Sequence, residues 1–124
     1  MKIHESAENY LEAILMLKQE KGVVRSIDVV HHMEFSKPSI SRAMSQLREN
    51  GYITMDKEGF IELTEAGMAI AESIYERHKL LTKWLIRLGV SPETAAEDAC
   101  RIEHDISQES FQCLKAHIAQ QERL

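Results

Sequence analysis

Apolar residues in the first part of the chain recur every three or four positions, which is the period of an amphipathic helix. One such run covers residues 6–21, and a shorter one covers residues 26–33, where we expect Ser26 to be the N-cap. A third run follows a proline-containing turn at residues 36–39 and stops at Gly51. The pattern therefore predicts three helices, the middle one short.

The period then changes from helical to strand-like. Residues 52–55 and 60–63 are two short β-like runs, and the segment 56–59, with the sequence DKEG, is a strong turn signal between them. Three helices followed by a hairpin form a winged helix-turn-helix, in which the hairpin is the wing. We therefore expect residues 1–64 to be a winged helix-turn-helix domain.

The second half of the chain returns to the helical period. Thr64 can cap a long helix that runs from residue 65 to about residue 88, and Ser91 with Pro92 opens a second helix. Ser107 begins a last helix with an apolar stripe. The apolar sides of these helices need a cover, so we expect residues 65–124 to form a helical dimerisation domain. The predicted fold class is mainly α, and the protein is expected to be a homodimer.

The third predicted helix carries polar residues typical of a groove reader. The formal net charge is −5, yet residues 36–48 contain three bases and no acid. Hydroxyls and long donors without carboxylates can contact phosphates and base edges, although a solvated face with capping serines is the plainer interpretation for any one residue. We predict contacts to double-stranded operator DNA from Ser36, Lys37, Ser39, Ser41, Arg42, Ser45 and Gln46, and from Lys57 in the wing turn.

A different chemistry follows between residues 89 and 110, where six acids face one base. On a helix at about 100° per residue, Cys100, Glu103 and His104 point into one narrow arc. A thiolate, a carboxylate and an imidazole that converge can bind a divalent transition metal. Taken alone the triplet is weak, because a core thiol beside a surface imidazole is a common arrangement.

Two cysteines are too few for a disulfide scaffold, and no run of residues is long and apolar enough for a signal peptide or a membrane span. We expect a cytoplasmic protein with reduced thiols and no membrane partner. Cys113 lies near an apolar stripe and is expected to be a buried structural thiol. His31 and His32 are expected to lie on the surface.

Four ordered segments resemble one family over nearly the full length of the chain. They are SAENYLEAI at residues 6–14, LTEAG at 63–67, RHKLL at 77–81 and EDACRIEH at 97–104. The chain resembles the iron- and manganese-dependent repressors of the diphtheria-toxin-repressor type, in the short form without an SH3-like domain. The resemblance implies a regulator that binds operator DNA when a divalent metal holds its two DNA-binding heads at a fixed spacing.

The resemblance also implies a ligand set, namely Asn9, Glu12, His78, Cys100, Glu103 and His104. Two positions depart from a single branch of the family. Asn9 stands where manganese-type members have Asp and iron-type members have Met, and Cys100 follows the iron-type members. Thr82 and Ala96 stand at the positions of an ancillary iron-type site and cannot serve as such ligands.

The expected cofactor is Fe²⁺ or Mn²⁺, with Zn²⁺ and Co²⁺ as further candidates. Because a thiolate is a softer ligand than a carboxylate, we favour Fe²⁺ over Mn²⁺. The expected function is repression of metal-uptake genes. As a hypothesis for the mechanism, metal binding orders the first helix against the bundle before DNA arrives, so that metal and operator affinities are linked.

Two other classes of function stay open at this point. An enzyme could use Cys100 as nucleophile or a metal-activated water, but no glycine-rich substrate loop and no HExxH helix occur in the sequence. We therefore expect neither catalysis nor a small organic substrate. A winged-helix regulator that responds to an organic ligand or to oxidation of Cys100 would keep the DNA-binding half and leave the acids merely solvated.

Overall fold

The computed structural model describes residues 5–122 and is mainly helical, as the sequence predicts. The helices are α1 (Glu5–Lys21), α2 (Ser26–Met33), α3 (Lys37–Glu49), α4 (Glu65–Arg87), α5 (Pro92–Asp105) and α6 (Gln108–Glu122). The strands are β1 (Ile53–Met55) and β2 (Ile61–Leu63). The chain divides into two compact units, residues 1–73 and 74–124, and α4 begins in the first and ends in the second. In the described part of the chain, no helix is long and apolar enough to cross a membrane.

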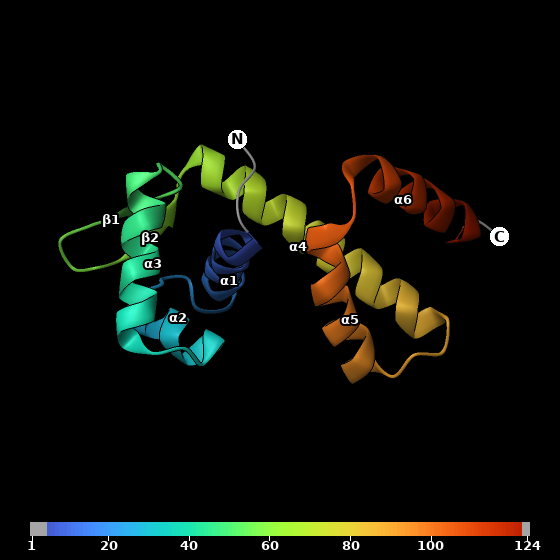
Figure 1. The fold of residues 1–124 in the computed structure, drawn as a ribbon, viewed down its shortest axis with the longest axis horizontal. Helices are drawn as coiled ribbons and strands as arrows, with labels where there is room; N and C mark the ends of the chain where they lie inside the picture. The colour runs from blue at the N-terminus through green and yellow to red at the C-terminus, as the bar shows by residue number, and fades with distance from the viewer. Residues whose placement is uncertain (1–4, 123–124) are drawn as a thin grey trace. The chain divides into compact units, whose positions relative to one another are not determined.

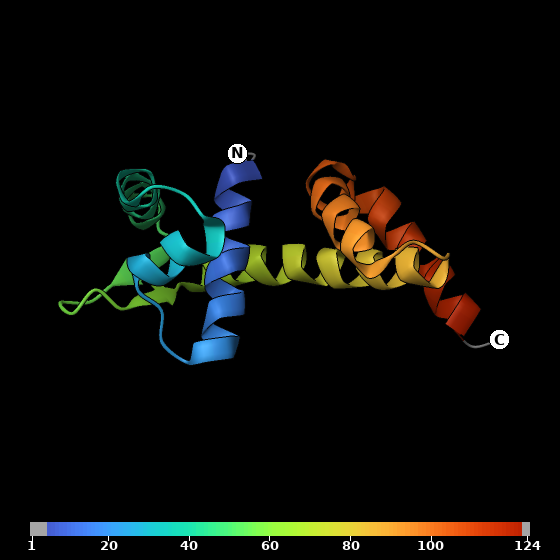
Figure 2. The ribbon, with the colours of Figure 1, turned by 90° about the horizontal axis from the view of Figure 1, so that it is seen from below.

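The N-terminal unit has an apolar core between α1, α2, α3 and the hairpin. The two strands are antiparallel, with Ile53 opposite Leu63 and Met55 opposite Ile61. In Figures 1 and 2 the turn of the hairpin extends away from the three helices, as a wing does. The core residues exposed by 3% or less include Leu11, Ile14, Val24, Val29, Ile40, Met44, Leu47, Ile53 and Ile61.

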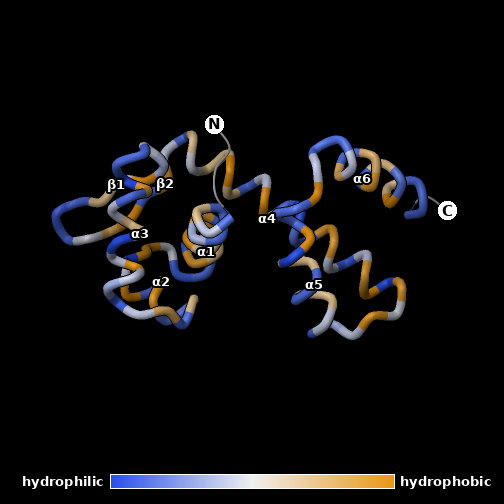
Figure 3. Tube along the Cα trace, in the orientation of Figure 1, coloured by the Kyte–Doolittle hydropathy of each residue, from blue (hydrophilic) through white to orange (hydrophobic). Residues whose placement is uncertain are grey.

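The wing is held by side-chain and backbone hydrogen bonds that the sequence only partly indicates. Asp56 Oδ1 accepts from the backbone N–H groups of Glu58, at 3.0 Å, and Phe60, at 2.8 Å. The Ile61 N–H donates to the Val24 carbonyl at 2.7 Å, and the Arg25 guanidinium lies 4.2 Å from the centre of the Phe60 ring. The segment before α2 therefore supports the hairpin, and Figure 3 shows the turn itself as hydrophilic.

The cap of α2 differs from the sequence prediction. Ser26 is the first helical residue and Arg25 is the N-cap, so the expectation for Ser26 is wrong. Asp28 explains the shift, because its Oδ2 accepts from the Arg25 backbone N–H at 2.9 Å. The Asp28 carboxylate therefore makes the bond of a capping box in which the side chain at the third helical position accepts from the N-cap backbone N–H.

The wing joins the long helix through a close backbone contact. Thr64 Oγ1 donates to the Gly51 carbonyl at 2.7 Å and accepts from the Gly67 N–H at 3.2 Å, so Thr64 caps α4 as predicted. A Cβ added at Gly67 would lie 2.0 Å from the Tyr52 carbonyl oxygen. Gly67 therefore allows the start of α4 to lie directly against the end of the α3–β1 connection.

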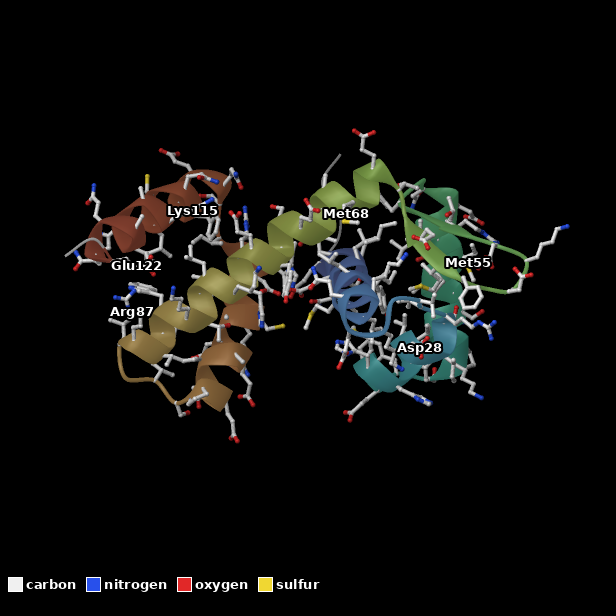
Figure 4. The ribbon with its side chains drawn as sticks, turned by 180° about the vertical axis from the view of Figure 1, so that it is seen from behind. Asp28, Met55, Met68, Arg87, Lys115 and Glu122 are labelled. Carbon is white, nitrogen blue, oxygen red and sulfur yellow. The ribbon has the colours of Figure 1, made fainter. Side chains whose placement is uncertain are left out.

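The C-terminal unit contains residues 74–87 of α4 together with α5 and α6. Its buried residues include Ile74, Leu81, Ala95, Ala99, Phe111 and Ile118. Lys83 and Arg87 of α4 pair with Glu122 of α6 at 3.0 and 3.1 Å, and Lys115 pairs with Glu76 at 3.1 Å. Figure 4 labels Arg87, Lys115 and Glu122 among these residues. The hydrogen bond from Lys83 lowers the pKa of Glu122 below its usual value. These ion pairs tie α6 to the long helix.

The thiol on α6 also differs from the prediction. Cys113 is exposed, so the expectation of a buried structural thiol is wrong. The apolar stripe of α6 buries Phe111 and Ile118, and Cys113 lies outside the buried positions of that helix. His31 and His32 are exposed on α2, as predicted.

Candidate metal centre

Helix α5 brings three potential metal ligands together. One ligand atom from each of Cys100, Glu103 and His104 lies within 4.8 Å of the other two. The spacing of three and four residues places these side chains on one side of the helix. Ser91 caps this helix by accepting from the Thr94 N–H at 3.4 Å, and Pro92 is its first residue. The local sequence thus forms the helix, and the helix aligns the three side chains.

The three side chains differ in their exposure. Glu103 is 0% exposed and the His104 side chain is 1% exposed, whereas Cys100 is exposed. The other buried residues of α5 are two alanines, Ala95 and Ala99. A carboxylate is therefore the largest buried side chain of this helix, although burying a charge is costly unless something compensates it.

Compensation of the Glu103 carboxylate within the chain is incomplete. Oε2 lies 3.0 Å from His78 Nδ1 on α4, which can donate a hydrogen bond to it. Oε1 is buried and has no hydrogen-bond partner. His104 Nε2 lies 3.4 Å from Oε1, close enough for an ion pair but not oriented as a hydrogen bond. A buried, under-satisfied carboxylate oxygen between a thiol and imidazoles fits a divalent transition metal.

His78 thus joins the cluster on α5 from the last part of α4. The residue before it, Arg77, donates from Nη1 to the backbone carbonyls of Glu103, at 3.0 Å, and Ile106, at 2.9 Å. Within the sequence Arg77 belongs only to the RHKLL motif, and nothing in its spacing signals a contact with the end of another helix. The tertiary structure alone reveals this bond to a predicted ligand.

Asn9 and Glu12 lie on α1, in the N-terminal unit. Glu12 is one of the six buried residues of that helix. Carboxylates are rarely buried unless a structural or functional partner compensates their charge. Their roles as metal ligands stay predictions.

The predicted DNA-binding residues lie on one exposed helix and on the wing. All are exposed except Ser45, which is partly buried. Ser36 is the N-cap of α3: its Oγ accepts from the Ser39 N–H at 3.3 Å and lies 2.9 Å from Ser39 Oγ. These two hydroxyls therefore have a structural role whether or not they also contact DNA. The buried positions of α3 are Ile40, Met44 and Leu47.

Comparisons with known proteins agree with this arrangement. Residues 2–60 match the family model for the iron dependent repressor N-terminal DNA binding domain, and residues 64–123 match that for its metal binding and dimerisation domain. The chain is 34% identical over 116 residues to the transcriptional regulator MntR of Salmonella typhimurium. This alignment covers 94% of this chain and 74% of that protein. It is 32% identical over 102 residues to the HTH-type transcriptional regulator MntR of Geobacillus kaustophilus, covering 82% of this chain and 72% of that protein.

The fold is also similar to solved structures. The manganese regulator SloR superposes with a TM-score of 0.80 at 24% identity, over 96% of this chain and 55% of that chain. The present chain therefore spans about half the length of that structure. The family consists of transcriptional regulators and not of enzymes. With both family models and relatives above 30% identity in agreement, the chain belongs to the iron-dependent repressor family of metal-dependent transcriptional regulators.

Proposed function

We propose that this protein is a repressor of metal-uptake genes whose operator binding is activated by a divalent transition metal. The observation that carries the proposal is the buried carboxylate of Glu103, with one oxygen lacking a hydrogen bond, in a cluster with Cys100 and His104. Repression by a metal-loaded protein would reduce uptake when the metal is abundant. The iron dependent repressor family models that match the chain support repression as the direction of control.

The ligands that would hold the metal are Cys100, Glu103 and His104 on α5 and His78 on α4. Glu12 and Asn9 are predicted to add oxygen ligands, and Asn9 would be the weaker because an amide brings no charge. A bound divalent cation supplies the positive charge that the buried carboxylate lacks. Because Cys100 contributes a thiolate, we propose Fe²⁺ ahead of Mn²⁺, with Zn²⁺ and Co²⁺ as competitors.

The partner proposed for the N-terminal unit is double-stranded operator DNA. The exposed residues of α3 include hydroxyls, an amide and three bases, of which Lys37 and Arg42 are proposed DNA contacts, and Lys57 lies on the wing. We keep the functional boundary between residues 64 and 65, where the wing ends and α4 begins. A homodimer is proposed because one winged helix covers only part of the site that tight, specific binding needs.

Metal affinity and operator affinity are linked if this function is right. A metal that raises operator affinity by some factor must itself be bound more tightly, by the same factor, when the operator is present. The linkage is a thermodynamic requirement and does not depend on the path that connects the two sites.

The test is an anaerobic operator-binding assay, with a duplex selected from a random-sequence library by the metal-loaded protein. Operator affinity is measured by fluorescence anisotropy with excess chelator and with Mn²⁺, Fe²⁺, Co²⁺ or Zn²⁺. We expect at least tenfold activation by metal and loss of that activation in C100A and E12A. Equal affinity with chelator and with every metal would contradict the proposed function, and stronger activation by Mn²⁺ than by Fe²⁺ would contradict only the metal preference.

A further inference from the structure

Arg77 lies at the corner between α5 and α6, beside the cluster on α5. Its Nη1 donates to the carbonyls of Glu103 and Ile106, and its Nη2 donates to Gln108 Oε1 at 2.7 Å. The guanidinium carbon also lies 5.2 Å from the centre of the Phe111 ring, and Phe111 is 2% exposed. One side chain of α4 therefore contacts the last turn of α5, the connection that follows it and the first turns of α6.

The bonds of Arg77 compensate the end of a helix. The last four carbonyls of an α-helix lack partners within the helix, and a cation near them interacts favourably with the helix dipole. The Ile102 carbonyl already accepts from the Ile106 N–H at 3.0 Å. Arg77 provides donors for the next carbonyl, that of Glu103, and for Ile106 beyond the helix.

All three of these hydrogen bonds end on neutral oxygens. The Glu103 backbone accepts from Arg77, while the Glu103 carboxylate lies against His78 Nδ1 at 3.0 Å. A guanidinium paired directly with that carboxylate would neutralise the charge that a cation needs. Arg77 instead fixes the backbone that carries Glu103 and leaves the carboxylate charge to the cluster.

Arg77 and His78 are neighbours on α4, and both contact Glu103, one through its backbone and one through its side chain. A shift of the α5 terminus along α4 would therefore change the position of Glu103 relative to His78. We propose that Arg77 is a positioning residue, which sets the separation of the ligands on α4 and α5. This inference rests on the proposed function, because it concerns the same metal site.

The test uses Co²⁺ as the probe, since its visible absorption depends on ligand geometry and its near-ultraviolet band reports a cysteine thiolate ligand. We compare R77K and R77A with R87K in the full-length protein. Arg87 is the matched control because it is on the same helix and bonds α6 through Glu122 at 3.1 Å. For each protein we measure Co²⁺ affinity, the absorption spectrum and the unfolding temperature with chelator.

We expect R77K to lower Co²⁺ affinity about tenfold and to change the visible bands while keeping the thiolate band, since residues that orient metal ligands typically contribute 10- to 100-fold in affinity. R87K should leave affinity within about twofold and the spectrum unchanged, even if its unfolding temperature falls. Should R77A fail to fold, R77K decides. Wild-type affinity and spectrum in R77K would overturn the inference, as would equal changes in R87K.

The same data separate this inference from the proposed function. Wild-type protein that does not bind Co²⁺, or C100A protein that keeps the thiolate band, would overturn the proposed metal site and the inference together. Wild-type protein that binds Co²⁺ through Cys100, with R77K unaltered, would overturn only the role of Arg77.

Discussion

Helices α3 and α5 have the same kind of N-terminal start signal but opposite charge. Each has a serine N-cap, Ser36 or Ser91, and a proline within its first two positions. Helix α3 contains three bases and one acid, which is its last residue, whereas α5 contains five acids and one arginine. The caps and prolines determine where each helix starts and say nothing about what it binds.

The buried sides of the two helices differ more than the exposed sides. Helix α3 buries Ile40, Met44 and Leu47, and α5 buries two alanines and Glu103. Burial of a large apolar side chain stabilises the packing of a helix against its domain by roughly 1.5–3 kcal/mol. Glu103 gives up that contribution and adds a charge that needs a partner. In the proposed function, the buried face of α3 serves stability and its exposed face would contact DNA, whereas the buried carboxylate of α5 would itself hold the metal.

The largest expected effect comes from removing the buried charge. E103Q should lower metal affinity at least about 100-fold, because a neutral amide replaces the carboxylate that lies within reach of Cys100 and His104. Isothermal titration under anaerobic conditions measures it. The control is E97Q, an exposed acid on the same helix, which should stay within about twofold. Similar losses in both variants would mean that the net acidity of α5, and not the buried position, attracts the metal.

The next largest effect should be a loss of operator affinity on changing helix α3. R42A removes an exposed base from the face of α3 and is expected to lower operator affinity by about 1–3 kcal/mol, roughly 5- to 150-fold, without changing metal affinity. Fluorescence anisotropy at two salt concentrations checks both the loss and a smaller salt dependence. R101A, which removes the only arginine of α5, serves as the control. An equal loss of operator affinity in R101A would contradict the proposal that α3 binds DNA and α5 binds metal.

A smaller effect tests what the helices share. S36A and S91A each remove a hydroxyl that accepts from a backbone N–H three residues ahead. Each should lower the free energy of unfolding by about 1 kcal/mol in urea titrations with chelator. Only S36A should also weaken operator binding, since Ser36 lies on the proposed DNA-binding face. Weakened operator binding by S91A in the presence of saturating metal would count against this separation.

The smallest effect concerns an acid used only for structure. The Arg25 backbone N–H and then Lys21 lower the pKa of Asp28 below its usual value of 3.8, through hydrogen bonds of 2.9 and 3.0 Å. Because the folded-state pKa is the lower one, the stability that Asp28 contributes is present above pH 3.8 and is lost as pH falls through the folded-state pKa. In D28N, the free energy of unfolding should therefore fall less steeply as the pH is lowered.

The control for this last prediction is K21M, which removes the second cause and keeps the first. It should retain part of the acid dependence that D28N loses. If the free energy of unfolding fell as steeply with decreasing pH in D28N as in the wild type, other carboxyls, and not the cap of α2, would govern the stability of the N-terminal unit in acid.

Much of the fold follows from local chemistry. Helical periodicity, Thr64, Ser91 and Pro92 predict helix starts that the structure confirms, and the DKEG turn predicts the hairpin. The cap of α2 does not follow, because the sequence offers Ser26 and the structure uses the Asp28 side chain with Arg25. The exposure of Cys113 does not follow either, because closeness to an apolar stripe in sequence does not determine whether a residue falls on the buried side of the helix.

The family, the order of the helices and the residue types available to bind metal can all be predicted from the sequence, since they depend on motifs and spacing along one chain. The family resemblance implied that His78 and Glu103 share a site. The tertiary structure added that Glu103 is fully buried, that its Oε1 has no hydrogen-bond partner, and that Arg77 bonds its backbone carbonyl. Helical spacing relates residues three or four positions apart. Residues 25 positions apart meet only through packing, which no local pattern encodes.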